Sequence, residues 1–275
     1  MIRILAFSDI HNNLACVDKL ISQVSGEKFD CVVVAGDIGN QTAPTFFEKL
    51  SVLPYPIFYV YGNWDSKLSY NAKFSDNSIH LHRNIQEIGG YYFVGFSGCP
   101  AHWGQNPCYI EKKKQLESNY SATLSAHREI KRKIKEKKRG VDALTELEDS
   151  KDFRDYRHAK KTLIGEINHE NKRALAALLV DEKQVDMRKV IIVTHERLTK
   201  ITDYFPKPPL LTLFGHLHKY SLKQWRDCTF INISHLDNQP SSFKQKPKPA
   251  TPGNYCIITI ENGAITSEKV DLIHL

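Results

Sequence analysis

Short apolar segments that each end in a polar motif constrain the fold of this chain more than any other feature. Three of them lie within the first 65 residues, and each has the length and β-branched composition of a buried strand: Ile2–Phe7, Asp30–Ala35 and Pro56–Tyr61. Residues at helical spacing separate them, at Leu14–Val24 and around Phe46–Leu50. Strands alternating with helices predict an α/β fold with parallel strands.

Further strands are expected in the rest of the chain. The predicted segments are Ile79–Arg83, Glu87–Ser97 with a turn at Gly89-Gly90, Val190–Thr194, Leu210–Phe214, and two or more strands up to Ile233. After a Pro-, Lys- and Ser-rich loop at Asn238–Gly253, a closing hairpin is expected from Tyr255–Ile260 and Ala264–Val270 around the turn Glu261-Asn262-Gly263.

The segment between Cys108 and Gln184 is long, charged and helical in pattern. Its expected helical parts are Asn119–Arg139 with a stop at Gly140, Val141–Ile167 and Lys172–Val180. From Lys112 to Arg139 there are eleven Lys or Arg residues and three Glu, a net charge of +8 where the whole chain has +7. Two interpretations remain open: a solvated arm or oligomer contact, or a cap that attracts a polyanion such as nucleic acid.

Composition narrows the class of protein. The chain has 275 residues, enough for one large domain or two small ones. Six scattered cysteines without short paired spacings argue against a zinc ribbon or a disulfide framework, so we expect reduced thiols and a cytoplasmic location. No apolar run reaches membrane-spanning length and the start lacks the pattern of a signal peptide, so no membrane association is expected.

Polar residues at the ends of the predicted strands suggest a metal site. Asp9 and His11, two residues apart, can point the same way. The other strand-end residues are Asp37, Asn63, His195, His216 and His218. Parallel strands end at one edge of a sheet, so these side chains can converge there. Individually, they also fit a helix cap, an ordinary turn or a core histidine. Together, four imidazoles, two carboxylates and an amide suit two Mn, Fe, Zn, Co or Ni ions better than Mg or Ca.

The motifs Asp9-Ile10-His11, Gly36-Asp37, Gly62-Asn63-Trp64-Asp65, Thr194-His195 and Gly215-His216-Leu217-His218 resemble those of the calcineurin-like metallophosphoesterases. The resemblance runs from residue 1 to about 110 and resumes at about 185. It implies a single domain over 1–275, a four-layer αββα sandwich with a charged helical insertion at about 108–184, and a dinuclear metal site.

The resemblance also assigns roles to these residues. Asp9, His11 and His218 would hold one metal, Asn63, His195 and His216 the other, and Asp37 would bridge the two ions. Manganese is the expected metal. The implied activity is phosphoester hydrolysis by a metal-bridging hydroxide, with Asp37, Asn63 and His195 as catalytic residues.

Two positions depart from the family pattern. Many members have His where this chain has Trp64, and its absence favours phosphodiesters, such as nucleotides or nucleic acid, over substrates with poor leaving groups. Where members often have Asn-Pro-Gly-Ser, this chain has Asn232-Ile233-Ser234-His235, so His235 is either the missing proton donor or a surface histidine.

Two alternatives to a phosphodiesterase remain at this point. A phosphomonoesterase acting on nucleotides or phosphoproteins would use the same metal centre. A non-catalytic scaffold is a different class, of which the retromer subunit of this fold family is an example. A scaffold is expected to have lost metal ligands, whereas all seven positions are filled here. The sequence leaves the oligomeric state open.

Overall fold

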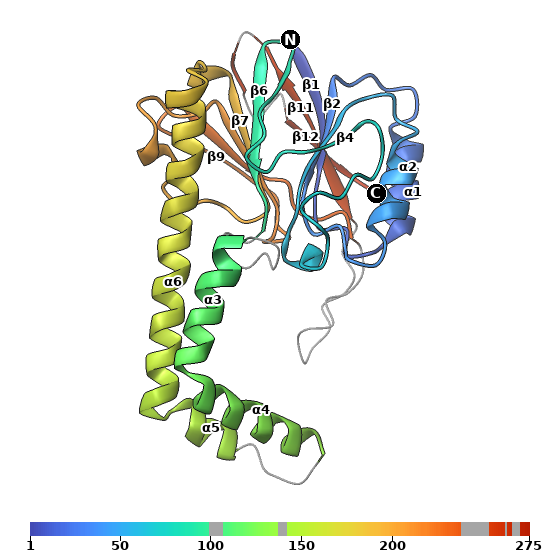
Figure 1. The fold of residues 1–275 in the computed structure, drawn as a ribbon. Coiled ribbons are helices and arrows are strands. Elements are labelled where there is room, and N and C mark those ends of the chain that lie inside the picture. The colour runs from blue at the N-terminus through green and yellow to red at the C-terminus, as the bar shows by residue number, and fades with distance from the viewer. Residues whose placement is uncertain (99–106, 137–141, 238–252, 262, 266–269) are drawn as a thin grey trace. The chain divides into compact units, whose positions relative to one another are not determined.

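A computed structural model of the chain describes residues 1–98, 107–136, 142–237, 253–261, 263–265 and 270–275, drawn as the coloured ribbon in Figure 1. The chain forms two compact units. The first comprises Met1–Gln105 and Asn171–Leu275, and the second comprises Asn106–Glu170. The second unit overlaps the insertion expected at about 108–184.

Six strands form the first sheet of the first unit. In spatial order they are β12 (Val270–His274), β11 (Asn254–Ile260), β1 (Ile2–Phe7), β2 (Cys31–Ala35), β3 (Ile57–Val60) and β4 (Ser78–His80). The strands from β1 to β4 run parallel, as the apolar runs predict. Strand β11 pairs antiparallel with β1, and β12 with β11, so the sheet is mixed.

The second sheet also has six strands. In spatial order they are β5 (Gln86–Ile88), β6 (Tyr91–Phe96), β7 (Val190–Thr194), β8 (Leu211–Phe214), β10 (Cys228–Asn232) and β9 (Ser221–Trp225). Four neighbours, from β6 to β10 in this order, are parallel, and the two edge strands are antiparallel.

Apolar side chains bind the sheets and helices of the first unit into four layers. The helices α1 (Leu14–Gln23) and α2 (Ala43–Leu50) cover the outer face of the first sheet, as Figure 1 shows. The inner faces share one core, in which Ile4 and Val60 of the first sheet pack with Val193 of the second. Leu175 and Leu179 pack on the outer face of the second sheet. The predicted αββα sandwich is confirmed.

Four helices build the second unit: α3 (Pro107–Asn119), α4 (Ser121–Lys135), α5 (Asp142–Glu148) and α6 (Lys151–Ala176), the last of which ends in the first unit. Phe153 and Ile130 are buried, and the ring centroids of Phe153 and His127 are 4.8 Å apart. Ion pairs join Lys112 to Glu170 at 2.6 Å and Arg157 to Glu148 at 2.9 Å.

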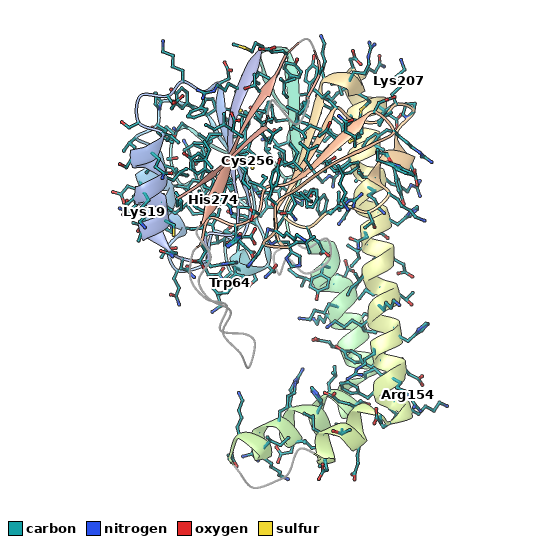
Figure 2. The ribbon with its side chains drawn as sticks, turned by 180° about the vertical axis from the view of Figure 1, so that it is seen from behind. Lys19, Trp64, Arg154, Lys207, Cys256 and His274 are labelled. Atoms are coloured by element: carbon teal, nitrogen blue, oxygen red, sulfur yellow. The ribbon has the colours of Figure 1, made fainter. Side chains whose placement is uncertain are left out.

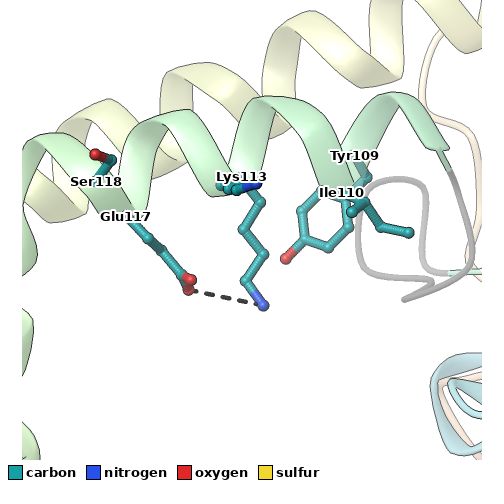
Figure 3. Close-up of a pocket in the computed structure, with 6 residues that line it drawn as sticks. Tyr109, Ile110, Lys113, Glu117 and Ser118 are labelled. Carbon is teal, nitrogen blue, oxygen red and sulfur yellow. Dashed lines mark ion pairs between the residues drawn. The ribbon is translucent and has the colours of Figure 1, made fainter.

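A shallow pocket lies on one face of α3, as the close-up in Figure 3 shows. Its lining residues are Tyr109, Ile110, Lys113, Lys114, Glu117 and Ser118, and an ion pair of 3.7 Å joins Lys113 to Glu117. All six lie within three turns of one helix, and none belongs to the predicted metal site.

Several predicted boundaries were wrong. The expected helix Asn119–Arg139 is interrupted at Tyr120, and the helical segments expected to end at Ile167 and to resume at Lys172 are one helix, α6. The last strand is Val270–His274 instead of Ala264–Val270. Residues 137–141 and 238–252, including the predicted stop at Gly140 and most of the predicted loop, lie outside the described residues. None of the described helices combines the length and apolar composition that crossing a bilayer requires.

Candidate metal centre

The polar motifs of both sheets meet beyond the ends of their parallel strands. After β1, Asp9 donates its N–H to the Gly36 carbonyl, which follows β2, at 3.0 Å. After β8, His216 donates its N–H to Asp9 Oδ2 at 3.0 Å. After β7, His195 accepts at its carbonyl the N–H of Gly215 at 3.0 Å. The carboxyl edges of the two sheets therefore supply one site.

Two groups of side chains bring possible metal-ligand atoms together. One group is Asp9, His11 and His218, and the other is Asp9, Asp37 and His195, with the ligand atoms of each group within 4.8 Å of one another. Asp9 belongs to both groups. The Nε2 atoms of His11 and His195 lie 3.4 and 3.2 Å from Asp37 Oδ2. Asp37 therefore faces both groups, as a bridging ligand would.

The unpaired oxygen of Asp9 shows that the site fits a cation. Its Oδ2 accepts hydrogen bonds from Ser8 Oγ at 2.6 Å and from the His216 N–H. Its Oδ1 is buried and has no hydrogen-bond partner of adequate geometry among the described residues, although His218 Nε2 lies 3.1 Å away. A buried, unpaired carboxylate oxygen is costly unless a cation binds it. Carboxylate and imidazole ligands together suit divalent transition metals.

The backbone at the predicted ligands is held in a conformation that non-glycine residues rarely adopt. Asp9, His11, Asp37, His216 and His218 have φ angles of 56°, 50°, 54°, 68° and 50°. Each left-handed residue costs on the order of 1 kcal/mol. Hydrogen bonds between the loops hold these conformations, which cluster at functional sites because they aim side chains at one point.

Gly62 is required because the motif after β3 passes close to Asp37. A Cβ atom at Gly62 would lie 2.5 Å from the Asp37 nitrogen and 2.8 Å from His195 Cγ. Any side chain at this position would push apart two predicted ligands. The Gly-Asn pair of the motif thus reflects a close approach of backbones.

Asp65 ties the β2 and β3 motifs together. Its buried carboxylate accepts the N–H groups of Gly62 and Gly39 at 2.7 Å each, and that of Ile38 at 3.3 Å. Burial and the nearby Asp37 raise the pKa of Asp65 to about 6. The sequence marked Asp65 as part of a motif but gave no sign of this structural role.

Two hydrogen bonds orient the histidine rings. The Nδ1 atom of His195 lies 2.9 Å from the Ala35 carbonyl, so it carries the proton and leaves Nε2 to face Asp37. The Nδ1 atom of His11 lies 3.3 Å from Asp237 Oδ2, and the other oxygen of Asp237 accepts a bond from Asn13 Nδ2 at 2.8 Å. Sequence reasoning missed Asp237, because it lies in a polar loop with no motif spacing.

The electrostatics of the centre favour positive charge. Burial lowers the pKa of His195, but Asp37 and Asp9 outweigh it and raise that pKa to about 10. Burial also lowers the pKa of His11, while Asp237 and Asp37 raise it to about 9. Burial raises the pKa of Asp37, yet its histidine neighbours bring it below the ordinary value. The carboxylates thus stabilise protons on the histidines, and a divalent cation would satisfy the same charge.

The remaining predicted site residues lie around the two groups. His216 Nδ1 is 3.3 Å from His195 Nε2. Asn63 is exposed and begins a short 3-10 helix, Asn63–Asp65, and the next residue, Trp64, donates its N–H to Asp37 Oδ1 at 2.8 Å. Neither His216 nor Asn63 belongs to the two Asp/His groups, so their metal-ligand roles stay predictions.

His235 lies beside the site. Its ring stacks on that of His218, with centroids 5.4 Å apart and an angle of 19° between the planes. Its Nδ1 lies 3.1 Å from Ser234 Oγ. Burial and the neighbouring His218 lower the pKa of His235, and the Asp9 and Asp237 carboxylates oppose them. The ring is thus one residue away from the ligands, and its role as a proton donor stays a prediction.

Solved structures share this fold. The protein TT1561 of Thermus thermophilus has a TM-score of 0.54 and 12% identity, with 99% of this chain and 98% of that chain covered. A novel archaeal phosphodiesterase has a TM-score of 0.42 and 13% identity, with 99% of each chain covered. Vps29 of Chaetomium thermophilum has a TM-score of 0.40 and 10% identity, covering 95% of this chain and 86% of its own. No curated protein matches the chain.

The sequence also matches a family model over nearly its whole length. The model describes the calcineurin-like phosphoesterase superfamily domain, and the match covers residues 2–263. Members of this superfamily are generally phosphoester hydrolases that bind divalent metals. The strand-end motifs, the double sheet and the matched model agree, and the chain belongs to the calcineurin-like phosphoesterase superfamily.

Proposed function

We propose that this chain is a phosphodiesterase that acts on nucleotides or nucleic acid with two divalent transition metals, manganese foremost. The observation that carries the proposal is the pair of Asp/His groups that share Asp9, whose buried Oδ1 has no hydrogen-bond partner among the described residues. A single tetrahedral metal site would leave part of this ligand set unused.

The residues divide between the two ions. Asp9, His11 and His218 hold one ion, Asn63, His195 and His216 hold the other, and Asp37 lies between them. The bound cations supply Lewis acidity, which lowers the pKa of a coordinated water and neutralises charge that develops on the phosphoryl oxygens. The backbone hydrogen bonds and the rings of His195 and His11 hold the ligands in place before substrate arrives.

The preference for diesters rests on Trp64. Its indole carries no proton that it can donate to a leaving alkoxide, unlike the histidine at this position in many family members. A diester with a good leaving group needs little proton donation, whereas an alkyl monoester needs more. His235 is the candidate donor, because its ring stacks on His218.

The basic segment Lys112–Arg139 is proposed to attract nucleic acid towards the enzyme. On α4, Arg132 and Lys133 already form ion pairs with Glu129 at 2.8 and 3.1 Å. Arg128, Lys131 and Lys135 are exposed and recur three and four residues apart, so they form one stripe along the helix. This stripe, Arg128/Lys131/Lys135, has the charge to bind phosphates in any sequence.

The test is a substrate screen of manganese-reconstituted protein. The substrates are bis-p-nitrophenyl phosphate, p-nitrophenyl phosphate, an alkyl phosphomonoester, cyclic nucleotides and single-stranded DNA. We expect two metal ions per chain and a higher kcat/KM for diesters than for alkyl monoesters. Turnover of alkyl monoesters at an equal or higher kcat/KM would contradict the diester proposal.

Asp37→Asn is the matched variant for this screen. It keeps the size of the side chain and removes the charge that faces both groups, so metal content and turnover should both fall. A variant with wild-type metal content and turnover would rule out the bridging role. A wild-type protein that binds metal but hydrolyses none of the esters would favour a non-catalytic scaffold.

A further inference from the structure

Four aromatic rings form a row across the proposed metal centre. The ring centroids of Trp64 and His11 are 4.6 Å apart, those of His11 and His218 are 4.9 Å apart, and those of His218 and His235 are 5.4 Å apart. The middle two are proposed metal ligands. Trp64 therefore forms one end of a continuous row of rings that passes the place where a phosphate would bind.

Trp64 is fixed in place yet partly open. Its N–H donates to Asp37 Oδ1 at 2.8 Å, and the short 3-10 helix Asn63–Asp65 holds its backbone. Its indole contacts the His11 ring, and the side chain nevertheless remains 36% exposed. Figure 2 shows the labelled Trp64 at the lower edge of the sandwich. A large, rigid ring beside a phosphate site offers a flat surface at little cost in conformational entropy.

We propose that the exposed part of Trp64 stacks on a planar substituent of the phosphodiester, a nucleobase being the fitting one. This inference rests on the proposed function and adds a specificity-determining residue to it. Every nucleobase has a flat π-face, so stacking selects nucleosides over alkyl groups without reading sequence. Because the ring contacts the ligand His11, it is one side chain away from the proposed metal, and a sugar can span this separation between phosphate and base.

A purely structural role for Trp64 makes a different prediction. If the indole only supports the His11 ring, its removal should weaken metal binding and harm every substrate to the same extent. If it stacks on a base, its removal should harm nucleoside esters selectively. Two substrates that share their leaving group separate these roles, because any effect on the metals or on bond cleavage applies to both.

The matched substrates are the p-nitrophenyl ester of thymidine 5′-monophosphate and ethyl p-nitrophenyl phosphate. The specificity ratio is kcat/KM for the first divided by kcat/KM for the second, at saturating manganese. Trp64→Ala should lower this ratio roughly five- to hundredfold, mainly through KM, because base stacking is lost. Trp64→Phe should retain most of the ratio, and Trp64→Leu should lose it.

Trp225→Ala is the control, because Trp225 is another exposed tryptophan, 58% exposed, on edge strand β9. It should leave the ratio unchanged. An equal fall of kcat/KM on both substrates in Trp64→Ala would assign Trp64 to support of His11 and overturn the stacking proposal. An unchanged ratio would overturn it as well.

A binding measurement separates this inference from the proposed function. Calorimetry with manganese-loaded protein compares the affinities for thymidine 5′-monophosphate and ethyl phosphate. If the wild-type protein hydrolyses neither ester, the phosphodiesterase proposal fails. The stacking proposal then stands if the protein's preference for the thymidine ligand disappears in Trp64→Ala and persists in Trp225→Ala, and it falls if the preference is absent or survives both changes.

Discussion

Asp9 and Asp37 each divide their two oxygens between the protein and the histidines. One oxygen of each accepts a backbone N–H, from His216 for Asp9 and from Trp64 for Asp37. The other faces imidazole nitrogens at 3.1 to 3.4 Å. Hydrogen bonds to one oxygen fix the direction of the other, so the protein itself aims each carboxylate.

Asp237 is expected to tune metal affinity at the residue scale. It orients His11 through Nδ1, and partners of this kind change metal affinity by about 10- to 100-fold when removed. Asp237→Asn should therefore weaken manganese binding within that range, because its amide is neutral and a poorer acceptor. Isothermal titration calorimetry checks this.

Asp227→Asn is the matched control for Asp237→Asn. It makes the same chemical change at an exposed turn between β9 and β10, where Asn tolerates the positive φ of 59°. It should leave manganese affinity at the wild-type level. Equal affinities in both variants would mean that Asp237 does not position the ligand.

A second pair of histidines stabilises the end of β4 without touching the metal ligands. His80 Nε2 lies 2.7 Å from Ser97 Oγ, and His82 Nδ1 accepts the Ser97 N–H at 3.0 Å. The His80 ring stacks on Tyr59, with centroids 5.0 Å apart. Burial lowers the pKa of His80 to about 4 and, with the neighbouring His80 and the charge of Arg83, that of His82 to about 3.

These lowered pKa values predict a loss of stability in mild acid. Below pH 6.5 the unfolded chain takes up protons at His80 and His82 that the folded chain refuses, so the free energy of unfolding falls as pH drops. The expected loss at pH 5 is about 2 kcal/mol per histidine. Urea unfolding of metal-free protein at pH 7 and pH 5 measures it.

The double variant His80→Gln/His82→Gln should lose most of this pH dependence, whatever its stability at pH 7. His11 and His195, whose pKa values are raised, act in the opposite direction and are common to both proteins. A variant that is as sensitive to acid as the wild type would show that other groups carry the effect.

The helix α4 carries a prediction about nucleic acid. Arg128→Gln/Lys131→Gln/Lys135→Gln should weaken binding of single-stranded DNA and lower the slope of log affinity against log salt by up to about 2, since each lost phosphate contact removes about 0.7. Fluorescence anisotropy at several salt concentrations measures both quantities.

Arg154→Gln/Lys160→Gln/Lys161→Gln is the charge-matched control on α6, where these three side chains are exposed. It removes the same charge and should leave the salt slope unchanged. Hydrolysis of bis-p-nitrophenyl phosphate should persist in both variants, because a small diester needs the metal centre alone. If the two variants lose affinity equally, net charge and not the stripe on α4 determines binding.

At the scale of elements, the strands were predictable and the helix boundaries were not. Runs such as Cys31–Ala35 are fully buried, so their composition alone marks them. The break at Tyr120 separates helices within a charged pattern that continues on both sides, and no Gly or Pro marks it. The metal-centre residues were found from the strand-end motifs, whereas Asp237 contacts His11 across 226 positions, which no local pattern reveals.

For the whole molecule, metal binding and folding should be linked. The proposed ligands come from both sheets, so the cations bind the folded chain and not the unfolded one. Saturation at about 100 times the dissociation constant adds about 2.7 kcal/mol to the free energy of unfolding. The melting temperature should therefore rise by roughly 5–10 °C with manganese and return with a chelator.

Differential scanning fluorimetry tests this linkage, with Asp37→Asn as the control. The variant should show a smaller rise, because it binds the metals more weakly. A wild-type melting temperature that none of Mn, Zn, Fe, Co or Ni changes would contradict a metal centre built from both sheets.

The bond from the His216 N–H to Asp9 also has a consequence for biosynthesis. It spans 207 positions of the chain, so the first ligand leaves the ribosome long before the partners that complete its surroundings. Contacts of such long sequence separation form late and slowly. Until they form, the acidic side chain of Asp9 stands among unpaired strands, and a nascent or truncated chain cannot take up both cations. Metal loading is thus a step that can only follow translation of β8.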